Sequence, residues 1–321
     1  MTYSTTVAIA GVGNLGRRYL EGILGSKQVS VVHVYDITEE ALAACEQVVR
    51  RFGVGGDKEP IAEVRLHRVI RTLPKSLDLV IVATSADARP QVVDHLAAQS
   101  RVSHWILEKV LAQDESGLNQ LIGATSKSSA WVNMPRRMME WYQRLRGLIR
   151  GNGPISMVVS GGDWGLCCNA VHFMDVLTWW SDEMPRDIEI GALDHEWSPA
   201  KRMGFWETHG SMSVAYSGGS SLTLTAGYDS TSIEIEVDAG GLSWLIVESE
   251  GMARRSDGLD LPGRVDLQSE ISAGLVDSIL TTGTCSLPTL EESVGTHRVL
   301  LRGLGDHWRR FGGDGNRVPI T

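Results

Sequence analysis

The stretch Thr6-Val-Ala-Ile-Ala10, followed by Gly11-Val-Gly-Asn-Leu-Gly16, decides the architecture of the amino-terminal part of the chain. The first five residues are apolar or β-branched, as in a buried strand, and the next six carry glycine at the first, third and sixth positions. The first glycine permits a tight turn, the second lets a pyrophosphate approach the backbone, and the third lets the next helix pack closely on the strand. The pattern predicts a strand, a phosphate-binding turn and a helix whose amino terminus faces an anion.

Short apolar runs alternate with helix-like segments over about the first 130 residues. Further strands are predicted at Val29–Tyr35, Leu77–Ala83 and Ser103–Leu107. Helices are predicted at Leu15–Leu24, Glu39–Phe52, Ala88–Gln99 and Glu115–Ser126. Such β-α-β-α order builds a right-handed, parallel, doubly wound sheet of the α/β class. We therefore expect residues 1–133 to form a Rossmann domain.

Asp36 ends the second predicted strand and lies 20 residues after Gly16. A carboxylate there accepts hydrogen bonds from the ribose diol of adenosine and repels a 2′-phosphate, so NAD is the expected cofactor. The alternative is a purely structural turn with a helix-capping aspartate nearby. The residues expected to contact NAD are Gly11, Gly13, Asn14, Leu15, Gly16, Asp36, Thr84, Ser85, Glu108 and Lys109.

Thr84, Ser85 and Lys109 are included because they follow predicted strands directly. Ligands of open α/β sheets lie beyond the carboxyl ends of the strands, where these side chains are expected. A Glu-Lys pair after a strand is also common in loops that only contact water.

Residues 134–321 show a different pattern, which indicates an α+β domain. Ile155–Val159 is strand-like, and a helix is predicted from about Asn169 to Trp180. Runs separated by Gly, Ser and Asp then predict an open antiparallel sheet with one wetter face. These runs are Asp187–Ile190, Gly210–Tyr216, Ser221–Ala226, Ser232–Val237 and Ser243–Val247. Late helices at Val265–Leu280 and Leu290–Trp308 are expected to return and pack across the domains.

Length, charge and cysteine content exclude several classes of protein. The chain has 321 residues, and 30 basic against 39 acidic side chains give a net charge of −9, which argues against nucleic acid as a partner. The apolar runs are too short to span a bilayer, and the polar amino terminus does not resemble a signal peptide. We expect a cytoplasmic protein whose four cysteines are free thiols.

The predicted helix after Gly165 carries the second group of candidate residues. Asn169, His172 and Asp175 are spaced three apart and share one side of a helix, where a histidine can exchange a hydroxyl proton near neutral pH. One alternative is a structural histidine satisfied by the aspartate. Another is a metal site at Cys167, Cys168 and His172, but a second ligand cluster is missing from the sequence, so we expect no metal.

Together, the glycine loop, Asp36, Glu108-Lys109 and the His172-x-x-Asp175 helix resemble the glucose-fructose oxidoreductase and inositol dehydrogenase family, Gfo/Idh/MocA, over nearly the whole chain. The resemblance implies that Lys109 and His172 are the catalytic residues at the site of hydride transfer. It also implies a homodimer or homotetramer paired through the open sheets.

The chain departs from the family pattern at two positions. Val110 replaces the proline that usually follows Glu-Lys, often after a cis bond; a cis bond is costly without proline, so we expect the backbone at Lys109 to differ. Cys168 replaces the aspartate that many members place one turn before the histidine. The usual carboxylate partner of His172 is therefore missing.

Two further stretches are expected to face substrate, together with Trp164, Asn169 and Asp175. One stretch is Asn133-Met-Pro-Arg-Arg137, and the other is Lys201-Arg202, which precedes the aromatic pair Phe205-Trp206. Arg137, Lys201 and Arg202 would bind an anionic group, and Trp164 would pack on a sugar ring. With Gly165-Leu-Cys-Cys-Asn169 before the histidine and Pro319-Ile-Thr321 at the terminus, the chain resembles a subgroup that is associated with bacterial acidic-sugar and surface-glycan gene clusters. The alternative is that these basic side chains are only solvated.

The sequence therefore predicts an NAD-dependent oxidoreductase that transfers a hydride between nicotinamide and a carbinol carbon of an anionic sugar or cyclitol. The alternative is an NAD(H)-binding sensor or regulator of the same fold without turnover. The change at Cys168 favours the regulator, and retention of Lys109 and His172 favours the enzyme.

Overall fold

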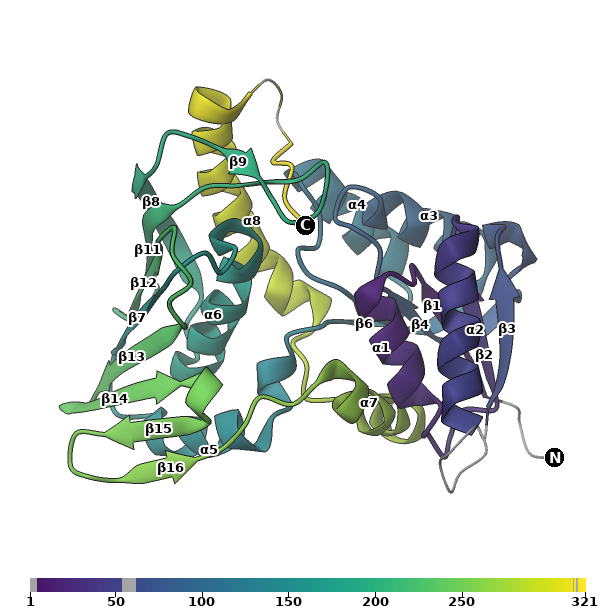
Figure 1. The fold of residues 1–321 in the computed structure, drawn as a ribbon, viewed down its shortest axis with the longest axis horizontal. Coiled ribbons are helices and arrows are strands. Elements are labelled where there is room, and N and C mark those ends of the chain that lie inside the picture. The colour runs from purple at the N-terminus through teal and green to yellow at the C-terminus, as the bar shows by residue number, and fades with distance from the viewer. Residues whose placement is uncertain (1–4, 54–61, 314, 316) are drawn as a thin grey trace. The chain divides into compact units, whose positions relative to one another are not determined.

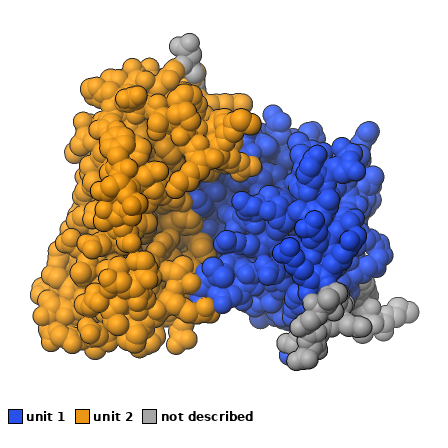
Figure 2. Space-filling view, in the orientation of Figure 1, with its two compact units in different colours: residues 1–111, 116–133, 266–290 blue, residues 112–115, 134–265, 291–321 orange. Residues whose placement is uncertain are grey.

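The computed structural model describes residues 5–53, 62–313, 315 and 317–321, which form two compact units (Figures 1 and 2). Unit 1 comprises residues 1–111, 116–133 and 266–290. Unit 2 comprises residues 112–115, 134–265 and 291–321. Each unit contains its own large sheet, and the strands of each sheet contribute buried apolar side chains to the core of that unit.

Unit 1 is built on a six-stranded parallel sheet, which confirms the predicted Rossmann architecture. Its strands are β1 (Thr6–Ala10), β2 (Val31–Tyr35), β3 (Glu63–His67), β4 (Ser76–Val82), β5 (Arg101–Leu107) and β6 (Ser129–Val132). The spatial order is β3-β2-β1-β4-β5-β6, so the order reverses between β1 and β4. The crevice beyond the carboxyl ends of these two strands is where ligands bind in such sheets.

The helices of unit 1 include one from far along the chain. They are α1 (Asn14–Ile23), α2 (Glu39–Gly53), α3 (Arg89–Gln99), α4 (Glu115–Thr125) and α7 (Gln268–Thr282), with a short 3-10 turn η1 (Ile70–Thr72). Helix α7 packs against α1 so closely that a Cβ on Gly22 would lie 2.5 Å from the Ser269 carbonyl oxygen. The hydroxyl of Ser26 also donates to the carboxylate of Asp277. Residues 266–290 thus belong to unit 1 although they follow most of unit 2 in sequence.

Unit 2 contains an eight-stranded sheet in the order β16-β15-β14-β13-β7-β12-β11-β8 (Figure 1). Its strands are β7 (Ile155–Gly161), β8 (Pro185–Leu193), β11 (Gly210–Tyr216), β12 (Ser221–Ala226), β13 (Glu234–Ala239), β14 (Leu242–Val247), β15 (Met252–Arg255) and β16 (Asp260–Pro262). A two-stranded ribbon, β9 (Ser198–Pro199) and β10 (Trp206–Glu207), accompanies it. The large sheet is mixed and mostly antiparallel, because β7 and β12 pair in parallel while its other pairs are antiparallel.

The helices of unit 2 are α5 (Glu140–Ile149), α6 (Leu166–Ser181) and α8 (Leu290–His307), with short turns η2 (Pro135–Arg137), η3 (Glu248–Glu250) and η4 (Trp308–Gly312). Helix α6 contacts β7 and β12 of the large sheet. On β13, Glu234, Glu236 and Asp238 are exposed while the residues between them are buried, so the sheet has the expected wetter face. Among the described residues, no helix is both long enough and apolar enough to cross a lipid bilayer.

Candidate active site

The glycine loop between β1 and α1 has the crowded geometry that its sequence predicts. Gly11 has φ +86°, and a Cβ on it would lie 2.8 Å from the Thr84 side chain. A Cβ on Gly16 would lie 2.1 Å from the Gly11 carbonyl oxygen. Gly13, by contrast, has no atom within 4 Å of the position of a Cβ among the described residues. The first and third glycines are therefore required by packing, and the second leaves space for a ligand against the backbone.

Asp36 lies just after β2 and is hydrogen-bonded to the glycine loop. One carboxylate oxygen accepts the backbone N–H of Val12 at 2.8 Å. The other accepts the N–H and the hydroxyl of Thr38, both at 2.9 Å. A carboxylate has about four acceptor positions, so room remains for a ribose hydroxyl. Asp36 thus also orders the loop, a role that the sequence did not predict.

Glu108, which the sequence assigned to the cofactor, is only 3% exposed and lies within a buried polar network of unit 1. Its Oε1 accepts hydrogen bonds from the Tyr19 hydroxyl and the Asn133 side-chain amide, both at 2.7 Å. The Asn133 amide also donates to Gln268 on α7 at 2.8 Å. Burial raises the pKa of Glu108, although these donors and the charge of Arg89 oppose the shift. The carboxylate therefore ties α1, β5, β6 and α7 together.

Arg89, the first residue of α3, is a residue that sequence reasoning missed. It is 1% exposed, and its guanidinium donates to the backbone carbonyls of Thr84, Val110 and Leu111. These carbonyls belong to the segments that follow β4 and β5, where Thr84, Ser85 and Lys109 lie. A single buried cation thus joins both segments at the carboxyl edge of the sheet.

From the sequence, we expect the backbone at Lys109 to differ from the cis arrangement that is frequent in the family, because Val110 replaces proline. That expectation is wrong. The Lys109–Val110 peptide bond is cis although residue 110 is Val. The backbone N–H of Lys109 donates to the Glu108 carboxylate at 3.3 Å, and the Lys109 side chain is partly exposed.

In unit 2, the loop before α6 brings two predicted substrate residues together. Gly165 has φ +73°, a conformation that favours glycine, and α6 begins directly after it. The side-chain amide of Asn169 donates to the Trp164 carbonyl at 2.8 Å, and the Trp164 indole N–H donates to the Thr225 carbonyl at 2.9 Å. His172 lies one turn beyond Cys168 on the same helix and is partly exposed. Trp164 and Asn169 therefore hold each other at the amino end of the helix that carries His172.

Arg137 and Asp175 were both expected to contact substrate, but their charged groups bind each other. The Arg137 Nε and Nη2 atoms donate to the two Asp175 oxygens at 3.0 and 2.8 Å. Both side chains are buried, with 8% and 3% of their surfaces exposed. Burial raises the pKa of Asp175 to about 6, and the Arg137 charge opposes this shift. The pair fixes η2 to α6, as a buried bidentate ion pair does.

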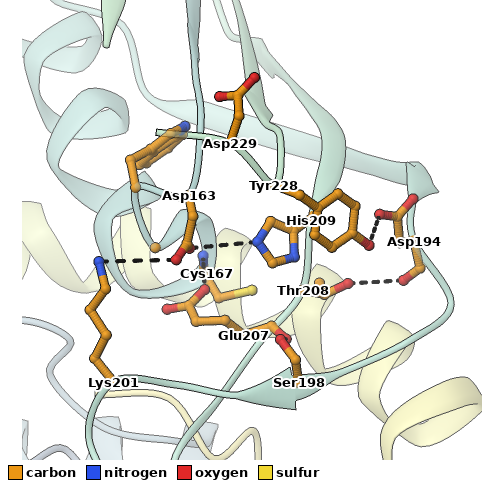
Figure 3. A network of polar contacts seen from close by, with 12 residues as sticks. Asp163, Cys167, Asp194, Ser198, Lys201, Glu207, Thr208, His209, Tyr228 and Asp229 are labelled. Carbon is orange, nitrogen blue, oxygen red and sulfur yellow. Dashed lines mark hydrogen bonds and ion pairs between the residues drawn. The ribbon is translucent and has the colours of Figure 1, made fainter. Parts of the chain in front are cut away.

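Glu207, on β10, caps the amino terminus of α6 from a distant part of the chain (Figure 3). Its carboxylate accepts the backbone N–H of Cys167 at 2.7 Å and that of Cys168 at 3.2 Å. These are first-turn groups that need an acceptor, and a negative charge there is favourable. Sequence reasoning missed Glu207, whose partners lie about 40 residues earlier.

Polar side chains surround this helix end (Figure 3). Asp163 lies 3.5 Å from His209 Nε2 and 4.0 Å from the Lys201 ammonium. The His209 ring stacks on Tyr228 at 4.1 Å, and the Tyr228 hydroxyl donates to Asp194 at 2.6 Å. Arg202 is exposed and lies over the Phe205 ring at 5.5 Å. Lys201 thus belongs to a wider polar cluster, of which the sequence had not predicted Asp163, His209 or Tyr228.

The four cysteines are free thiols. Cys168 donates weakly to the Gly165 carbonyl at 3.4 Å. Within the described ranges, no three side chains of His, Cys, Asp or Glu gather in a way that could hold a metal ion.

Comparisons with known proteins agree with this geometry. Residues 5–134 match the model GFO_IDH_MocA, described as an oxidoreductase family with an NAD-binding Rossmann fold. No curated protein matches the sequence.

Solved structures resemble nearly the whole chain at low sequence identity. Scyllo-inositol dehydrogenase from Lactobacillus casei, solved with NAD(H) and scyllo-inositol, is 14% identical with TM-score 0.66, covering 95% of this chain and 96% of its own. UDP-N-acetylglucosamine 3-dehydrogenase from Acidithiobacillus ferrooxidans is 14% identical with TM-score 0.68, covering 94% and 96%. A super-repressor mutant of Gal80p from Saccharomyces cerevisiae is 13% identical with TM-score 0.72, covering 95% and 96%. At such identity the likeness establishes a shared fold.

Proposed function

Because the chain carries the NAD-binding Rossmann domain of the Gfo/Idh/MocA oxidoreductases, we propose that it is an NAD-dependent dehydrogenase or reductase of a sugar or cyclitol. The observation that carries the proposal is the glycine loop, whose second glycine faces open space while Asp36 holds the Val12 N–H. The neighbours that act on inositols and on a UDP-sugar support the substrate class.

The residues of unit 1 fit a dinucleotide. The N–H groups of Asn14, Leu15 and Gly16 at the start of α1 would meet the pyrophosphate, since no side chain among the described residues caps that helix end. Asp36 would bind the adenosine ribose and disfavour a 2′-phosphate, so NAD(H) is proposed over NADP(H). Thr84 and Ser85 lie after β4 at the same sheet edge, and Thr84 Oγ1 is a buried hydroxyl with no partner among the described residues. The nicotinamide ring, when bound, supplies or accepts the hydride.

Lys109 and His172 are the proposed catalytic residues. In the oxidation direction, the Lys109 ammonium donates a hydrogen bond to the reacting oxygen, and an imidazole nitrogen of His172 accepts the hydroxyl proton. In the reverse direction the imidazolium returns that proton to the new hydroxyl oxygen.

The proposed substrate carries an anionic group. Lys201 and Arg202 are exposed cations on one loop, which supports a role in binding a carboxylate or phosphate. Trp164 and Asn169 remain candidates for sugar contact, and Asp163 and His209 join them because they lie in the cluster with Lys201. Arg137 and Asp175 are left out of direct substrate contact, because both side chains are buried in a bidentate ion pair with each other.

A second candidate function is a sensor or regulator that binds NAD(H) without turnover. The structural likeness to a super-repressor form of Gal80p favours it, as does Cys168 in the turn before His172. The retention of both Lys109 and His172 favours the enzyme.

Titration with NADH, followed by a substrate screen, tests the proposal. Protein fluorescence reports NADH binding, and absorbance at the nicotinamide band reports oxidation or reduction with inositols, uronic acids and UDP-sugars. Turnover of any of these compounds supports the enzyme. Tight NADH binding without turnover across the panel supports the regulator, and the absence of NADH binding rejects both candidate functions.

The proposal also includes a cytoplasmic homodimer or homotetramer paired through the outer face of the unit 2 sheet. Free thiols fit a reducing compartment. The strand residues Ser211, Ser213, Thr223 and Thr225 give that face small polar side chains. Light scattering over a range of concentrations tests the assembly, and a monomer throughout counts against it.

A further inference from the structure

Arg89 is buried in unit 1, and its guanidinium donates hydrogen bonds to backbone carbonyls of two separate segments. Its Nη1 atom donates to the carbonyls of Val110 and Leu111, the latter at 3.1 Å, and its Nη2 atom donates to the carbonyl of Thr84. The guanidinium is a rigid planar fork, so these bonds define the separation of the two segments that follow β4 and β5.

A buried cation is costly unless an opposite charge or polar groups compensate for its lost hydration. The three carbonyl oxygens supply part of this compensation. Glu108, also buried, lies close enough for the two charges to interact. Arg89 and Glu108 therefore stabilise each other within the network that includes Tyr19 and Asn133.

Glu108 and Arg89 both bind the backbone around Lys109. The N–H of Lys109 donates to Glu108 Oε2 at 3.3 Å, and the carbonyls of the next two residues, Val110 and Leu111, accept hydrogen bonds from Arg89. The main chain on both sides of Lys109 is thus tied to buried, oppositely charged side chains, while its own side chain remains partly exposed.

We infer that Arg89 is a positioning residue for Lys109: its fork holds the segment after β5 against the segment after β4 and so places the Lys109 ammonium. The catalytic part of this inference rests on the proposed function of Lys109. A displacement of about 1 Å in a reacting group can cost roughly 100-fold in rate, so a buried clamp of this kind matters for turnover.

The test uses Arg89→Lys, which keeps the charge but loses the fork, and Arg89→Met, which loses both. Arg101→Lys is the matched control, because Arg101 is an exposed arginine at the opposite end of β5. The first measurement is hydrogen exchange of the segment 109–112 in protein without added cofactor. The second is the separation of kcat from KM on a substrate found in the screen, with the Kd for NADH.

We expect exchange at 109–112 to be about 10-fold faster in Arg89→Lys and faster still in Arg89→Met, with β1 unchanged. We expect kcat to fall about 10-fold or more in Arg89→Lys, while KM changes by less than about 3-fold. Arg101→Lys should match the unmodified protein in each measurement.

Wild-type exchange at 109–112 in folded Arg89→Lys would overturn the inference, as would faster exchange with unchanged kcat. If Arg89→Met does not fold, Arg89→Lys decides. If the unmodified protein neither binds NADH nor turns over a substrate, the proposed function fails, and the exchange measurement still tests whether Arg89 orders this segment.

Discussion

The carboxylate of Asp36 accepts the backbone N–H of Val12 at 2.8 Å, inside the glycine loop. The residue proposed to select the cofactor therefore also orders the loop that would bind its phosphates. Removal of the side chain would change both properties at once. A substitution that keeps an acceptor oxygen but removes the charge separates them.

Asp36→Asn is expected to narrow the preference for NAD(H) over NADP(H) by about 10-fold, because the repulsion of a 2′-phosphate is lost while the amide oxygen can still accept from Val12. Fluorescence titration with NADH and NADPH measures both affinities. Asp94→Asn, at an exposed position on α3, is the control. Tighter binding of NADPH than of NADH by the unmodified protein would contradict the assignment.

Lys109→Ala and His172→Ala are each expected to lower kcat by about 100-fold or more, because positioned proton transfer and hydrogen bonding contribute on that scale. The Kd for NADH should change little. Steady-state kinetics and NADH titration provide the comparison, with Lys127→Ala at an exposed turn as the control. Wild-type rates in both variants would reject this catalytic pair.

Cys168→Ser is expected to keep most of the activity, since a serine hydroxyl can donate to the Gly165 carbonyl as the thiol does. A chelator should leave turnover unchanged if no metal takes part. Activity assays before and after dialysis against EDTA make the comparison. Loss on chelation, followed by recovery with zinc, would show that a metal is required.

Arg202→Ala is expected to raise KM for an acidic sugar by about 10-fold or more and to leave kcat nearly unchanged, because a charged hydrogen bond is lost equally in ground and transition states. A neutral sugar should show no such increase in KM. Steady-state kinetics with both sugars measures the difference. Equal KM changes for acidic and neutral sugars would mean that Arg202 does not recognise charge.

Arg137→Ala is instead expected to lower the free energy of unfolding by about 3 kcal/mol, since it leaves the buried Asp175 carboxylate unpaired. Thermal unfolding measures this loss.

Stability is expected to fall as pH decreases from about 6.5 to 4. His33 lies in β2, where burial, together with the neighbouring His67, lowers its pKa to about 4. The ordinary value applies in the unfolded chain, so the unfolded state binds the proton first and stability is lost through this window, on the order of 2 kcal/mol by pH 5. Urea unfolding at several pH values measures the slope. His33→Gln should flatten it, whereas His95→Gln at an exposed site should not.

The sheet of unit 1 was predictable because its central strands are largely apolar runs and its glycine loop has a fixed spacing. Strand β3 gave no such signal, since it lies at the sheet edge and alternates charged residues with partly buried ones. Helix α5 was missed although Trp141, Tyr142, Leu145 and Ile149 recur at helical spacing. That signal was present in the sequence.

The candidate site was less predictable, because burial and pairing depend on distant segments. Arg89 stands before a proline at a helix start and looks like a solvated side chain until the carbonyls of Val110 and Leu111 are placed beside it. Arg137 and Asp175 look like free charges in sequence, yet each is neutralised by the other across 38 positions. Motif spacing indicates local structure but does not reveal such partners.

The discontinuity of unit 1 has a consequence for biosynthesis. Residues 1–133 leave the ribosome long before residues 266–290, so α1 is made without α7. Helix α7 packs on α1 at Gly22 and accepts a hydrogen bond from Ser26, just after α1. Gln268, which accepts the Asn133 amide, also arrives late. The nascent unit 1 therefore lacks α7 until all eight strands of the large unit 2 sheet have been translated. A truncated chain that ends at residue 133 would keep the glycine loop but expose the α1 surface that α7 covers.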